Sequence, residues 1–545
     1  MKLPIRPIVG LLAAPLPIIA LVAVPAGAAT KPATQALRGD VVQAVGHSAR
    51  VGAVPAGRSL SVTVSLTPRD PAGLTAFLKQ VADPASAQYR HYLTVKQFAD
   101  RFGASASSIA QVTDYLKGQG LTVGQATANH LSLQATGSAA TVQKAFGTSL
   151  ATYHDAAGKR DFFANTAAPV LPANIAAAVT DVAGLSDYAT YSHFSTRLAK
   201  PAASKAVTGL TPAKARTGYN VASAISAGYN GSGSTVALLE FSAFKQSNIT
   251  TYDNYFSLST PTPAVVKAGG GTTDLSGEDE VELDIEVVQA LAPGATIKVY
   301  EAPNSDAGEI ALYSLVVSND VPSVSTSWGI DEADETASNR TALNTDFQEA
   351  AAQGQSVFAA SGDSGSDDAG NGGTSVDFPA SDPYVTGTGG TALTLTSAGA
   401  WSKETAWNGS GGGVSSYFAT PSFQTGVNTG SKRSVPDVAA DASPSTGWAV
   451  YSEGSWAEFG GTSAAAPNWA AFTAIYNSEA RAKSKPAFGY ANNTIYTLAA
   501  SSSYGSAFHD VKTGSNGAYS AGTGYDKVTG WGSYNGAGFL AAELG

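Results

Sequence analysis

The spacing of apolar and polar residues divides the chain into two parts. From about residue 29 to residue 195, strand-like alternation and helical spacing follow one another. They predict strands over Ser59–Leu66 and His130–Ala135, and helices over Pro71–Val81, Ser105–Leu116 and Ser138–Phe146. This mixture predicts an α+β domain over residues 29–195. Residues 196–209 are small and polar and include Pro201, which is typical of an exposed linker that a protease can cut.

Residues 210–545 show a different pattern, in which short apolar strands alternate with helices. Strands are predicted over Thr235–Phe241, Thr296–Tyr300, Ser356–Ala360 and Tyr384–Thr386, and helices over Glu278–Leu291, Ala307–Val316 and Thr341–Gln353. Alternation of this kind predicts an α/β fold with a doubly wound, mostly parallel sheet. Such folds place reactive groups at the carboxyl ends of the strands.

The predicted helix Glu278–Leu291 carries six acidic residues. On a helical wheel of about 100° per residue, Glu280 and Asp284 fall near the centre of its apolar face. The opposite face is expected to be solvated and holds Glu278, Glu282, Glu286 and Gln289, with Asp279 nearby. Carboxylates on an apolar face are costly to bury unless they are protonated or hydrogen-bonded. Glu280 and Asp284 are therefore either structural acids with satisfied partners or a catalytic pair with separated pKa values. The spacing of Ser276 and Asp279 resembles a capping box at the helix start.

A glycine-rich turn, Phe459-Gly-Gly-Thr-Ser-Ala-Ala-Ala-Pro467, places Ser463 on the first turn of an alanine-rich helix. Thr462 is the expected N-cap. A hydroxyl there lies at the positive end of the helix dipole, beside amide groups without intrahelical partners. Ser463 is therefore a candidate nucleophile, although the same pattern also fits an ordinary helix cap.

A nucleophilic serine needs a base to take its proton. Only one of the six histidines, His509, lies after the linker, beside Asp510, so a subtilisin-type triad would have to use it. No lysine follows Ser463 at short helical spacing, which leaves the carboxylates of the acidic helix. The segment Gly362-Asp-Ser-Gly365 looks like the nucleophile loop of chymotrypsin-like peptidases, with Ser364 attacking. That fold is all-β, whereas this segment follows a strand in an α/β pattern.

Composition narrows the function classes. A net charge of −10 argues against nucleic acid as a partner, because binding phosphates needs clustered Lys and Arg. The absence of cysteine excludes disulfides, thiolate metal sites and a cysteine nucleophile. With 14% charged residues and 58 glycines, the composition is typical of a secreted, loop-rich hydrolase.

The N-terminus has the features of a signal peptide over residues 1–28. Lys2 and Arg6 precede an apolar run over residues 8–24, and small residues end at Ala28. Pro15 and Pro17 interrupt the apolar run and Pro25 follows it, which argues against the alternative of a retained membrane anchor.

Three motifs in order give the chain after residue 28 its resemblance to a known family: Glu280-Val-Glu-Leu-Asp284, Phe358-Ala-Ala-Ser-Gly-Asp-Ser-Gly365 and Gly460-Gly-Thr-Ser-Ala-Ala-Ala-Pro467. The chain resembles the sedolisin family of serine-carboxyl peptidases, of the kumamolisin and pseudomonalisin kind. The resemblance implies a subtilisin-like catalytic domain over residues 210–545. The N-terminal domain, with Tyr89–Leu93 and Gln97–Gly103, is similar to the family's activation propeptide.

The resemblance also implies roles for individual residues. Ser463 would be the nucleophile, Glu280 the base and Asp284 the residue that orients the base. Asp363 would serve the oxyanion hole, and Glu240 and Trp328 would belong to the same hydrogen-bond network. Because a carboxyl group donates to an oxyanion only while it is protonated, we expect an acidic pH optimum.

A second signature lies in Phe508-His-Asp-Val511, Gly522-Thr-Gly-Tyr-Asp526 and Val528-Thr-Gly-Trp531. The resemblance implies one structural Ca²⁺, bound by the side chains of Asp510 and Asp526 and the carbonyls of Val511, Gly522 and Gly524. Oxygen ligands on a glycine-rich loop suit Ca²⁺. The alternative is that both aspartates make local turn bonds. Asp367 and Asp368, near Asp363, are expected to be solvated loop residues.

Together these observations predict a secreted, acid-acting endopeptidase made as a zymogen. The propeptide is expected to assist folding and to block the cleft until acid loosens carboxylate contacts and the linker is cut. We expect polypeptide substrates, a monomer, no nucleic-acid partner and no membrane attachment after signal removal. Two alternatives are a subtilisin-type peptidase using His509 and a catalytically inactive binding module on the same fold.

Overall fold

An eight-stranded sheet forms the centre of residues 210–545. The computed structural model describes residues 1, 33–156, 158–198, 207–427 and 429–545. The strand order is β13-β14-β12-β15-β17-β19-β20, with β23 also paired to β19. All pairings are parallel except β19 with β20, so the predicted mostly parallel α/β sheet is confirmed. The strands are β12 (Thr235–Glu240), β13 (Ala264–Lys267), β14 (Thr296–Glu301), β15 (Ser323–Thr326), β17 (Ser356–Ala360), β19 (Thr386–Leu395), β20 (Trp401–Ala406) and β23 (Val438–Asp441).

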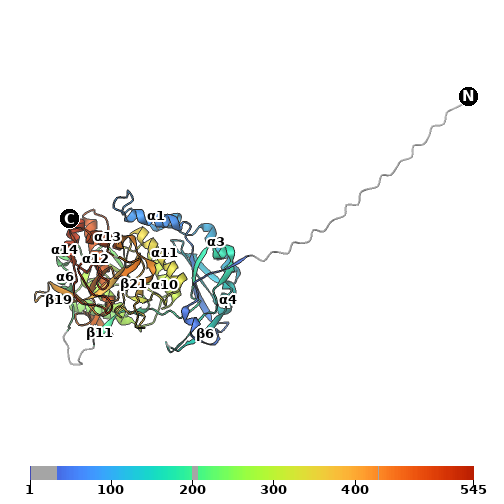
Figure 1. Cartoon of the computed structure of the whole chain (residues 1–545), viewed down its shortest axis with the longest axis horizontal. Coiled ribbons are helices and arrows are strands. Elements are labelled where there is room, and N and C mark those ends of the chain that lie inside the picture. Colours follow the sequence, from blue (N-terminus) through green and yellow to red (C-terminus); the bar gives the residue numbers. More distant parts are fainter. Residues whose placement is uncertain (2–32, 157, 199–206, 428) are drawn as a thin grey trace. The chain divides into compact units, whose positions relative to one another are not determined.

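Helices cover both faces of this sheet (Figure 1). One face packs against α9 (Glu278–Leu291) and α12 (Thr462–Ala482), and the other against α10 (Asp306–Ser318) and α11 (Ala337–Gln353). Strand β12 shows why its sequence is continuously apolar. Its Val236 and Leu238 pack with α9 and α12, whereas Ala237 and Leu239 pack with α10 and α11. A strand buried on both faces cannot alternate with polar residues.

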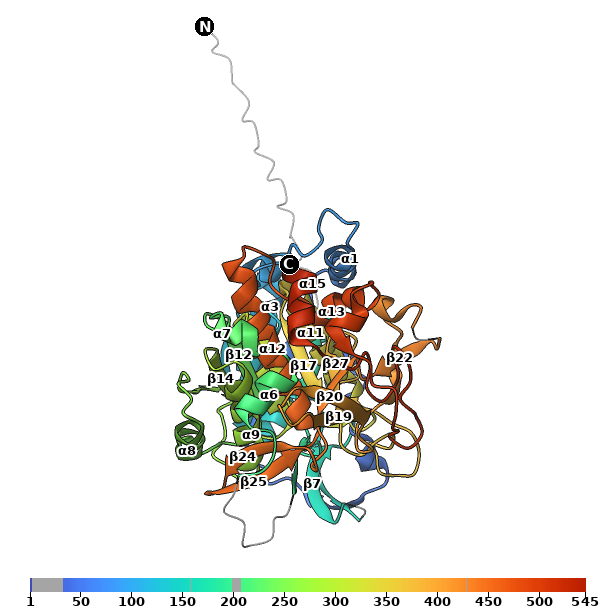
Figure 2. The ribbon, with the colours of Figure 1, turned by 90° about the vertical axis from the view of Figure 1, so that its left-hand side faces the viewer.

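Figure 2 shows helices α9 and α12 together with the short strands β24 and β25. Smaller elements complete this domain. They are α6 (Pro212–Gly218), α7 (Ala222–Ser226), α8 (Gln246–Phe256), β16 (Trp328–Asp331), β18 (Asp377–Phe378), β21 (Gly413–Ala419), η2 (Ser422–Gln424), β22 (Lys432–Val435), β24 (Trp448–Ser452), β25 (Ser455–Gly460), α13 (Ala491–Ala499), α14 (Tyr504–Ala507), β26 (Phe508–His509), β27 (Ser533–Tyr534) and α15 (Gly536–Leu544).

The N-terminal domain is α+β, as predicted. It contains antiparallel sheets of order β4-β5-β3-β9 and β2-β6-β7 and the pair β1-β8. Its elements are β1 (Thr34–Ala36), η1 (Gln43–Gly46), β2 (Ala49–Ala53), β3 (Ser59–Leu66), α1 (Pro71–Ala82), α2 (Val95–Arg101), α3 (Ala106–Gly118), β4 (Thr122–Ala126), β5 (Ser132–Ser138), α4 (Ala139–Phe146), β6 (Leu150–Asp155), β7 (Arg160–Asn165), β8 (Val170–Pro172), α5 (Ala173–Ala176) and β9 (Val179–Ala183), followed by β10 (Ser192–His193) and β11 (Thr196–Leu198).

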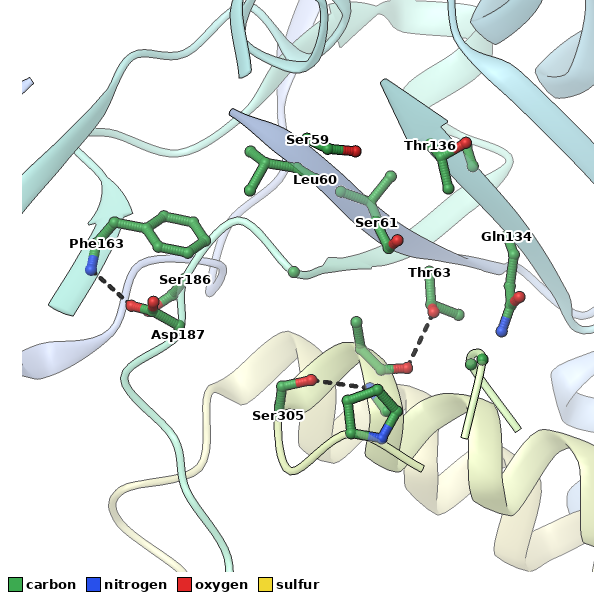
Figure 3. Close-up of a pocket in the computed structure, with 18 residues that line it drawn as sticks. Ser59, Leu60, Ser61, Thr63, Gln134, Thr136, Phe163, Ser186, Asp187 and Ser305 are labelled. Atoms are coloured by element: carbon green, nitrogen blue, oxygen red, sulfur yellow. Dashed lines mark hydrogen bonds between the residues drawn. The ribbon is translucent and has the colours of Figure 1, made fainter. Parts of the chain in front are cut away.

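The four-stranded sheet of the N-terminal domain packs on α10 and α11 of the larger domain. Thr63 Oγ1 on β3 donates to the Ala307 carbonyl at 3.0 Å, and Asn129 Nδ2 donates to Glu349 Oε2 on α11 at 2.7 Å. A pocket opens along this boundary, and Figure 3 shows Thr63 and Gln134 on one side of it and Ser305 on the other. This pocket belongs to the domain interface, and Ser463 is not among the residues that line it.

Local details differ from the sequence prediction at three places. The strand predicted at Tyr384–Thr386 begins only at Thr386 and runs to Leu395, because Tyr384 lies in a turn. Gly277, rather than a capping box, precedes α9, since the Ser276 hydroxyl donates to Asp274 Oδ2. The N-cap of α12 is Gly461, which makes Thr462 the first helical residue.

The predicted signal peptide, residues 1–28, lies outside the described residues except for Met1. None of the helices in the described part of the chain is both long and apolar enough to cross a membrane.

Candidate active site

The turn before α12 brings Ser463 to the carbonyl of Phe194. Gly461 has a φ of 110°, which favours glycine, and a Cβ there would clash with the Phe194 carbonyl oxygen. The Ser463 N–H donates to that oxygen at 3.2 Å, and the Ser463 carbonyl accepts from Ser327 Oγ at 3.2 Å. The Ser463 side chain is buried, and its Oγ has no hydrogen-bond partner among the described residues.

The two carboxylates that the sequence places on the apolar face of α9 are both fully buried. Ser327 Oγ lies 2.9 Å from each carboxylate oxygen of Asp284, so the hydroxyl that contacts Ser463 also holds Asp284. Burial, together with the nearby Glu240 and Glu280 carboxylates, raises the pKa of Asp284 well above its ordinary value. Ser327 therefore connects helix α9, through Asp284, to the turn that carries Ser463.

Glu240 extends this network from the end of β12. Its Oε2 accepts from the indole Nε1 of Trp328 at 2.7 Å. Burial raises the pKa of Glu240 well above its ordinary value, and so does the charge of Glu280. Neighbouring carboxyl groups in a dry site cannot all ionise, so Glu240 and Asp284 retain a proton between them.

The opposite face of α9 is buried, which corrects the expectation that it is solvated. Glu278, Glu282, Glu286 and Gln289 are at most 5% exposed. Helix α8 and strand β24 cover this face and supply donors. Glu282 accepts from the Lys245 N–H at 3.0 Å, and Glu286 accepts from the Tyr451 N–H at 2.9 Å. The helical wheel separates polar from apolar residues, but it does not show which neighbours pack on the polar side.

Asp363 lies three residues after the end of β17 and faces the start of α12. Its Oδ1 accepts from the Thr462 N–H at 2.8 Å and from Thr462 Oγ1 at 2.9 Å. Burial raises the pKa of Asp363 to about 8 despite these two donors, with a further contribution from Glu280. Its Oδ2 has no hydrogen-bond partner among the described residues. A Cβ placed on Gly461 would lie 2.7 Å from this oxygen and would also clash with the Phe194 carbonyl oxygen, so both oxygens face the same small space. The free oxygen of Asp363 and the Ser463 N–H therefore both lie beside the Phe194 carbonyl oxygen.

Residues 192–198 cross the site as two short strands, β10 and β11, joined by Phe194 and Ser195, and neither strand was among the predicted elements. Ser192 and His193 pair antiparallel with Gly329 and Trp328, and Thr196–Leu198 pair antiparallel with Glu458–Gly460. Between these pairs, the Phe194 N–H donates to the Ser327 carbonyl at 3.2 Å. The segment fell at the border between predicted domain and linker, and no periodicity of its own marked it.

His193 is the only histidine in the described part of the chain that has an ion pair with a predicted catalytic residue. Its Nδ1 lies 3.1 Å from Glu280 Oε2, and its ring lies edge-on to Trp328 with ring centroids 5.1 Å apart. Burial disfavours the imidazolium, but the contact with Glu280 prevails and raises the pKa of His193. His193 was not a predicted site residue, because it precedes the linker.

The alternative nucleophile and base lie elsewhere. The His509 ring stacks on Trp401, with centroids 4.0 Å apart, and burial lowers its pKa to about 4. Ser364 is exposed. Neither residue has a hydrogen bond or ion pair to Ser463 within the described residues. Asp368 is half-buried, and burial with nearby carboxylates such as Asp331 raises its pKa to about 7, which corrects the expectation that it is solvated.

The two aspartates that are predicted calcium ligands both bond to the loop over residues 522–526. Asp510 Oδ1 accepts from the Gly524 N–H at 3.0 Å, and Asp526 Oδ2 accepts from the Gly522 N–H at 2.9 Å. Lys512 Nζ lies 3.3 Å from Asp510 Oδ2. Val511 stands next to Asp510 in the chain. Each aspartate thus accepts from a loop N–H, which is the local turn bonding of the alternative, while their carboxylate oxygens are of the kind that Ca²⁺ prefers.

A buried serine at a helix start, buried carboxylates beside it and a peptide carbonyl between two oxyanion donors define the class of a serine-type peptidase. Comparison with known proteins gives the family. A model described as "Pro-kumamolisin, activation domain" matches residues 46–188, within the predicted propeptide.

Relatives match nearly the whole chain. Kumamolisin from Bacillus sp. (strain MN-32) is 36% identical over 527 residues, covering 90% of this chain and 93% of its own length. Sedolisin from Pseudomonas sp. (strain 101) is 33% identical over 517 residues, covering 88% of this chain and 86% of its own length. The solved structure of Pseudomonas sedolisin, a serine-carboxyl proteinase complexed with two molecules of pseudo-iodotyrostatin, superposes with a TM-score of 0.56 at 32% identity, covering 62% of this chain and 98% of that one.

The chain belongs to the sedolisin family of serine-carboxyl peptidases and carries the family's activation domain. It is therefore a serine-type peptidase made as a zymogen, whose N-terminal domain acts as an intramolecular inhibitor and whose substrates are polypeptides.

Proposed function

We propose that this chain is a secreted, acid-acting endopeptidase that cleaves peptide bonds through an acyl-enzyme on Ser463, with Glu280 as general base. The observation that carries the proposal is the position of the Phe194 carbonyl, which lies at the Ser463 N–H beside the free oxygen of Asp363. A carbonyl in that place is where negative charge would develop during attack by Ser463.

Each residue has a role in the proposed reaction. Ser463 attacks the carbonyl carbon, and its proton passes to Glu280. The Ser463 N–H and the protonated Asp363 stabilise the oxyanion. Glu280 then gives the proton to the leaving amine, and a water molecule activated in the same way hydrolyses the ester. Asp284, held by Ser327 and sharing a proton with Glu240, positions Glu280.

The raised pKa values favour action in acid. With a pKa of about 8, Asp363 is already protonated at neutral pH while the cleft is filled, so this residue alone does not confine activity to acid. Asp284 and Glu240 also have raised pKa values, and their shared proton is lost as pH rises. Loss of this proton would place negative charges on Asp284 and Glu240 beside Glu280. Their repulsion would disrupt the hydrogen bonds that position Glu280, so activity should fall as pH increases.

Two further parts of the proposal concern the ends of the chain. The predicted signal peptide supports secretion, and the prolines in its apolar run support removal rather than anchoring. At the other end, Asp510, Asp526 and the carbonyls of Val511, Gly522 and Gly524 would hold one structural Ca²⁺. The ion would link segments that no disulfide can connect, and its charge would displace Lys512 from Asp510.

Casein digestion at pH 4 by the acid-treated protein tests the catalytic assignment. Ser463→Ala and Glu280→Gln should each abolish turnover, whereas Ser364→Ala, as a matched serine change nearby, should leave it intact. A wild-type enzyme that is most active near neutrality and silent at pH 4 would contradict the carboxylate mechanism. A Glu280→Gln enzyme that remains active while His509→Ala is dead would instead support the subtilisin-type alternative.

A further inference from the structure

The strand Ser192–Leu198 lies in the cleft with the geometry of a bound substrate, and this step rests on the proposed function. The Phe194 N–H and carbonyl are both fixed, to the Ser327 carbonyl and the Ser463 N–H respectively, each at 3.2 Å. Antiparallel pairing holds the chain on both sides of this residue. The peptide bond presented to Ser463 is therefore Phe194–Ser195, one residue before the predicted boundary between propeptide and linker.

The residue before Phe194 places its side chain on the catalytic base. The His193 ring lies between Trp328 and the start of α9, with its Nδ1 3.1 Å from Glu280 Oε2. Asp279, on the same helix, and Asp363, after β17, are the other charged groups that act on the imidazole. The Ser195 hydroxyl, 3.2 Å from Nδ1, is the uncharged polar neighbour. The side chain thus faces three carboxyl groups from two elements.

We propose that Glu280, Asp279 and Trp328 form a specificity subsite that selects a protonatable side chain, histidine in this zymogen, immediately before the residue whose carbonyl is attacked. A buried carboxylate is most stable beside a cation, and a charged ligand side chain in this subsite supplies one. Trp328 adds an aromatic wall on the other side of the ring. The preferred substrates are peptides with histidine followed by an aromatic residue at the cleaved bond.

The subsite leaves the base able to react. Oε2 of Glu280 lies 3.1 Å from the imidazole Nδ1, and neither carboxylate oxygen has a hydrogen-bond partner among the described residues, so both can accept a proton. In the first self-cleavage, the bond from Ser463 Oγ to the Phe194 carbonyl carbon forms and the Phe194–Ser195 bond breaks. The Ser463 proton moves through Glu280 to the new Ser195 amine, and water then releases the Phe194 carboxylate.

Acidification of the purified full chain tests the first cut. The first new N-terminus should be Ser195, determined by N-terminal mass spectrometry at early times. His193→Ala should slow this cut about tenfold or more, His193→Lys should restore part of the rate, and Ser192→Ala should leave it unchanged, because the exposed Ser192 side chain does not face Glu280. A first N-terminus elsewhere, or equal rates for His193→Ala and wild type, would overturn the proposal.

Quenched fluorescent peptides test the subsite in the mature enzyme without any change to the protein. A series with His, Lys, Leu or Ala before Phe-Ser should show kcat/KM at least about tenfold higher for His than for Ala at acidic pH. The contact with Glu280 raises the imidazole pKa, so the His advantage is present while the imidazole is protonated and is lost as pH rises through that pKa, whereas Lys keeps its advantage. Equal cleavage of all four peptides would overturn the subsite but leave the proposed function standing. Failure to cleave any of them, or casein, would instead contradict the proposed function.

Discussion

Buried carboxyl groups at the boundary between the propeptide and the peptidase domain give a prediction about pH. Tyr191 of the propeptide donates its hydroxyl to Glu309 Oε2 at 2.5 Å and lies 3.1 Å from Glu335 Oε2. Asp306 is in the same cluster, 3.5 Å from that hydroxyl. Burial raises the pKa of each of these three carboxyl groups, and their mutual repulsion adds to the effect for Asp306 and Glu309.

The sign of the effect follows from the raised pKa values. A carboxyl group whose pKa is higher in the folded state contributes stability that is fully present below its unfolded pKa, near 4, and is lost as pH rises through the folded value. Each such group costs about 1 kcal/mol of folding free energy per pH unit across that window. Acid therefore strengthens this part of the interface, which is opposite to the expectation that acid loosens carboxylate contacts.

Glu309→Gln measures how the protonation of Glu309 contributes to the pH dependence of stability. The variant is made in a Ser463→Ala background, which prevents self-cleavage. Glutamine imitates the protonated glutamate, so the variant should have nearly wild-type stability at pH 4. Between about pH 5 and 7.5 it should become more stable than its parent, gaining about 1 kcal/mol per pH unit until the folded pKa is reached. Denaturant unfolding at several pH values measures the difference, with Asp114→Asn, an exposed carboxylate on α3, as the matched control.

The reasoning would be refuted by a Glu309→Gln variant that is less stable at pH 7.5 than at pH 4 relative to its parent. That result would mean that Glu309 is ionised and that Tyr191 and Asn339 hold it as a carboxylate. If the free energy of unfolding changed equally with pH in variant and parent, Glu309 would have the same protonation in the folded and unfolded states, which would also refute the reasoning.

Three further predictions concern single residues. Asp363→Ala should lower kcat on casein about 10²–10³-fold at pH 4 with a smaller change in KM, because one oxyanion donor is lost; an unchanged kcat would remove Asp363 from the oxyanion hole. Chelation with EDTA should lower the thermal midpoint of the wild type but not that of Asp526→Ala, and an equal shift in both would place the bound metal elsewhere. Arg433→Met should destabilise the fold by about 3–5 kcal/mol in denaturant unfolding, because it leaves the fully buried Asp437 without its 2.6 Å partner; replacing Asp437 by Leu as well should recover part of this loss.

Much of the fold was predictable because its signals are local. Strands β3 and β17 and helix α9 have the predicted bounds, since apolar runs and helical spacing reflect burial directly. The pairing of Glu280 and Asp284 on one face of α9 was also predictable from their four-residue spacing. Helix caps were predicted less well, because a glycine at positive φ, such as Gly461, replaced the expected side-chain cap.

The rest of the site depends on contacts between distant segments. Ser327 Oγ connects Asp284 to Ser463, and no pattern in the sequence around Ser327 signals this bridge. His193 is 87 residues before Glu280 and reaches it only because β10 pairs with β16. Register between strands that are far apart in sequence is a tertiary property, so reasoning from local spacing could not place His193 in the site.

Strand β11 would delay the appearance of activity after the proposed first cut. Thr196–Leu198 pair with β25 on the side of Ser463 from which the leaving amine must depart, and Arg197 also contacts Glu453 and Ser455 there. Breaking one bond does not dissolve this pairing, so the new N-terminal segment remains in the cleft as a tethered product. After a cut at Phe194–Ser195, the onset of turnover would follow the release of this short strand from β25, a first-order delay that does not depend on protein concentration.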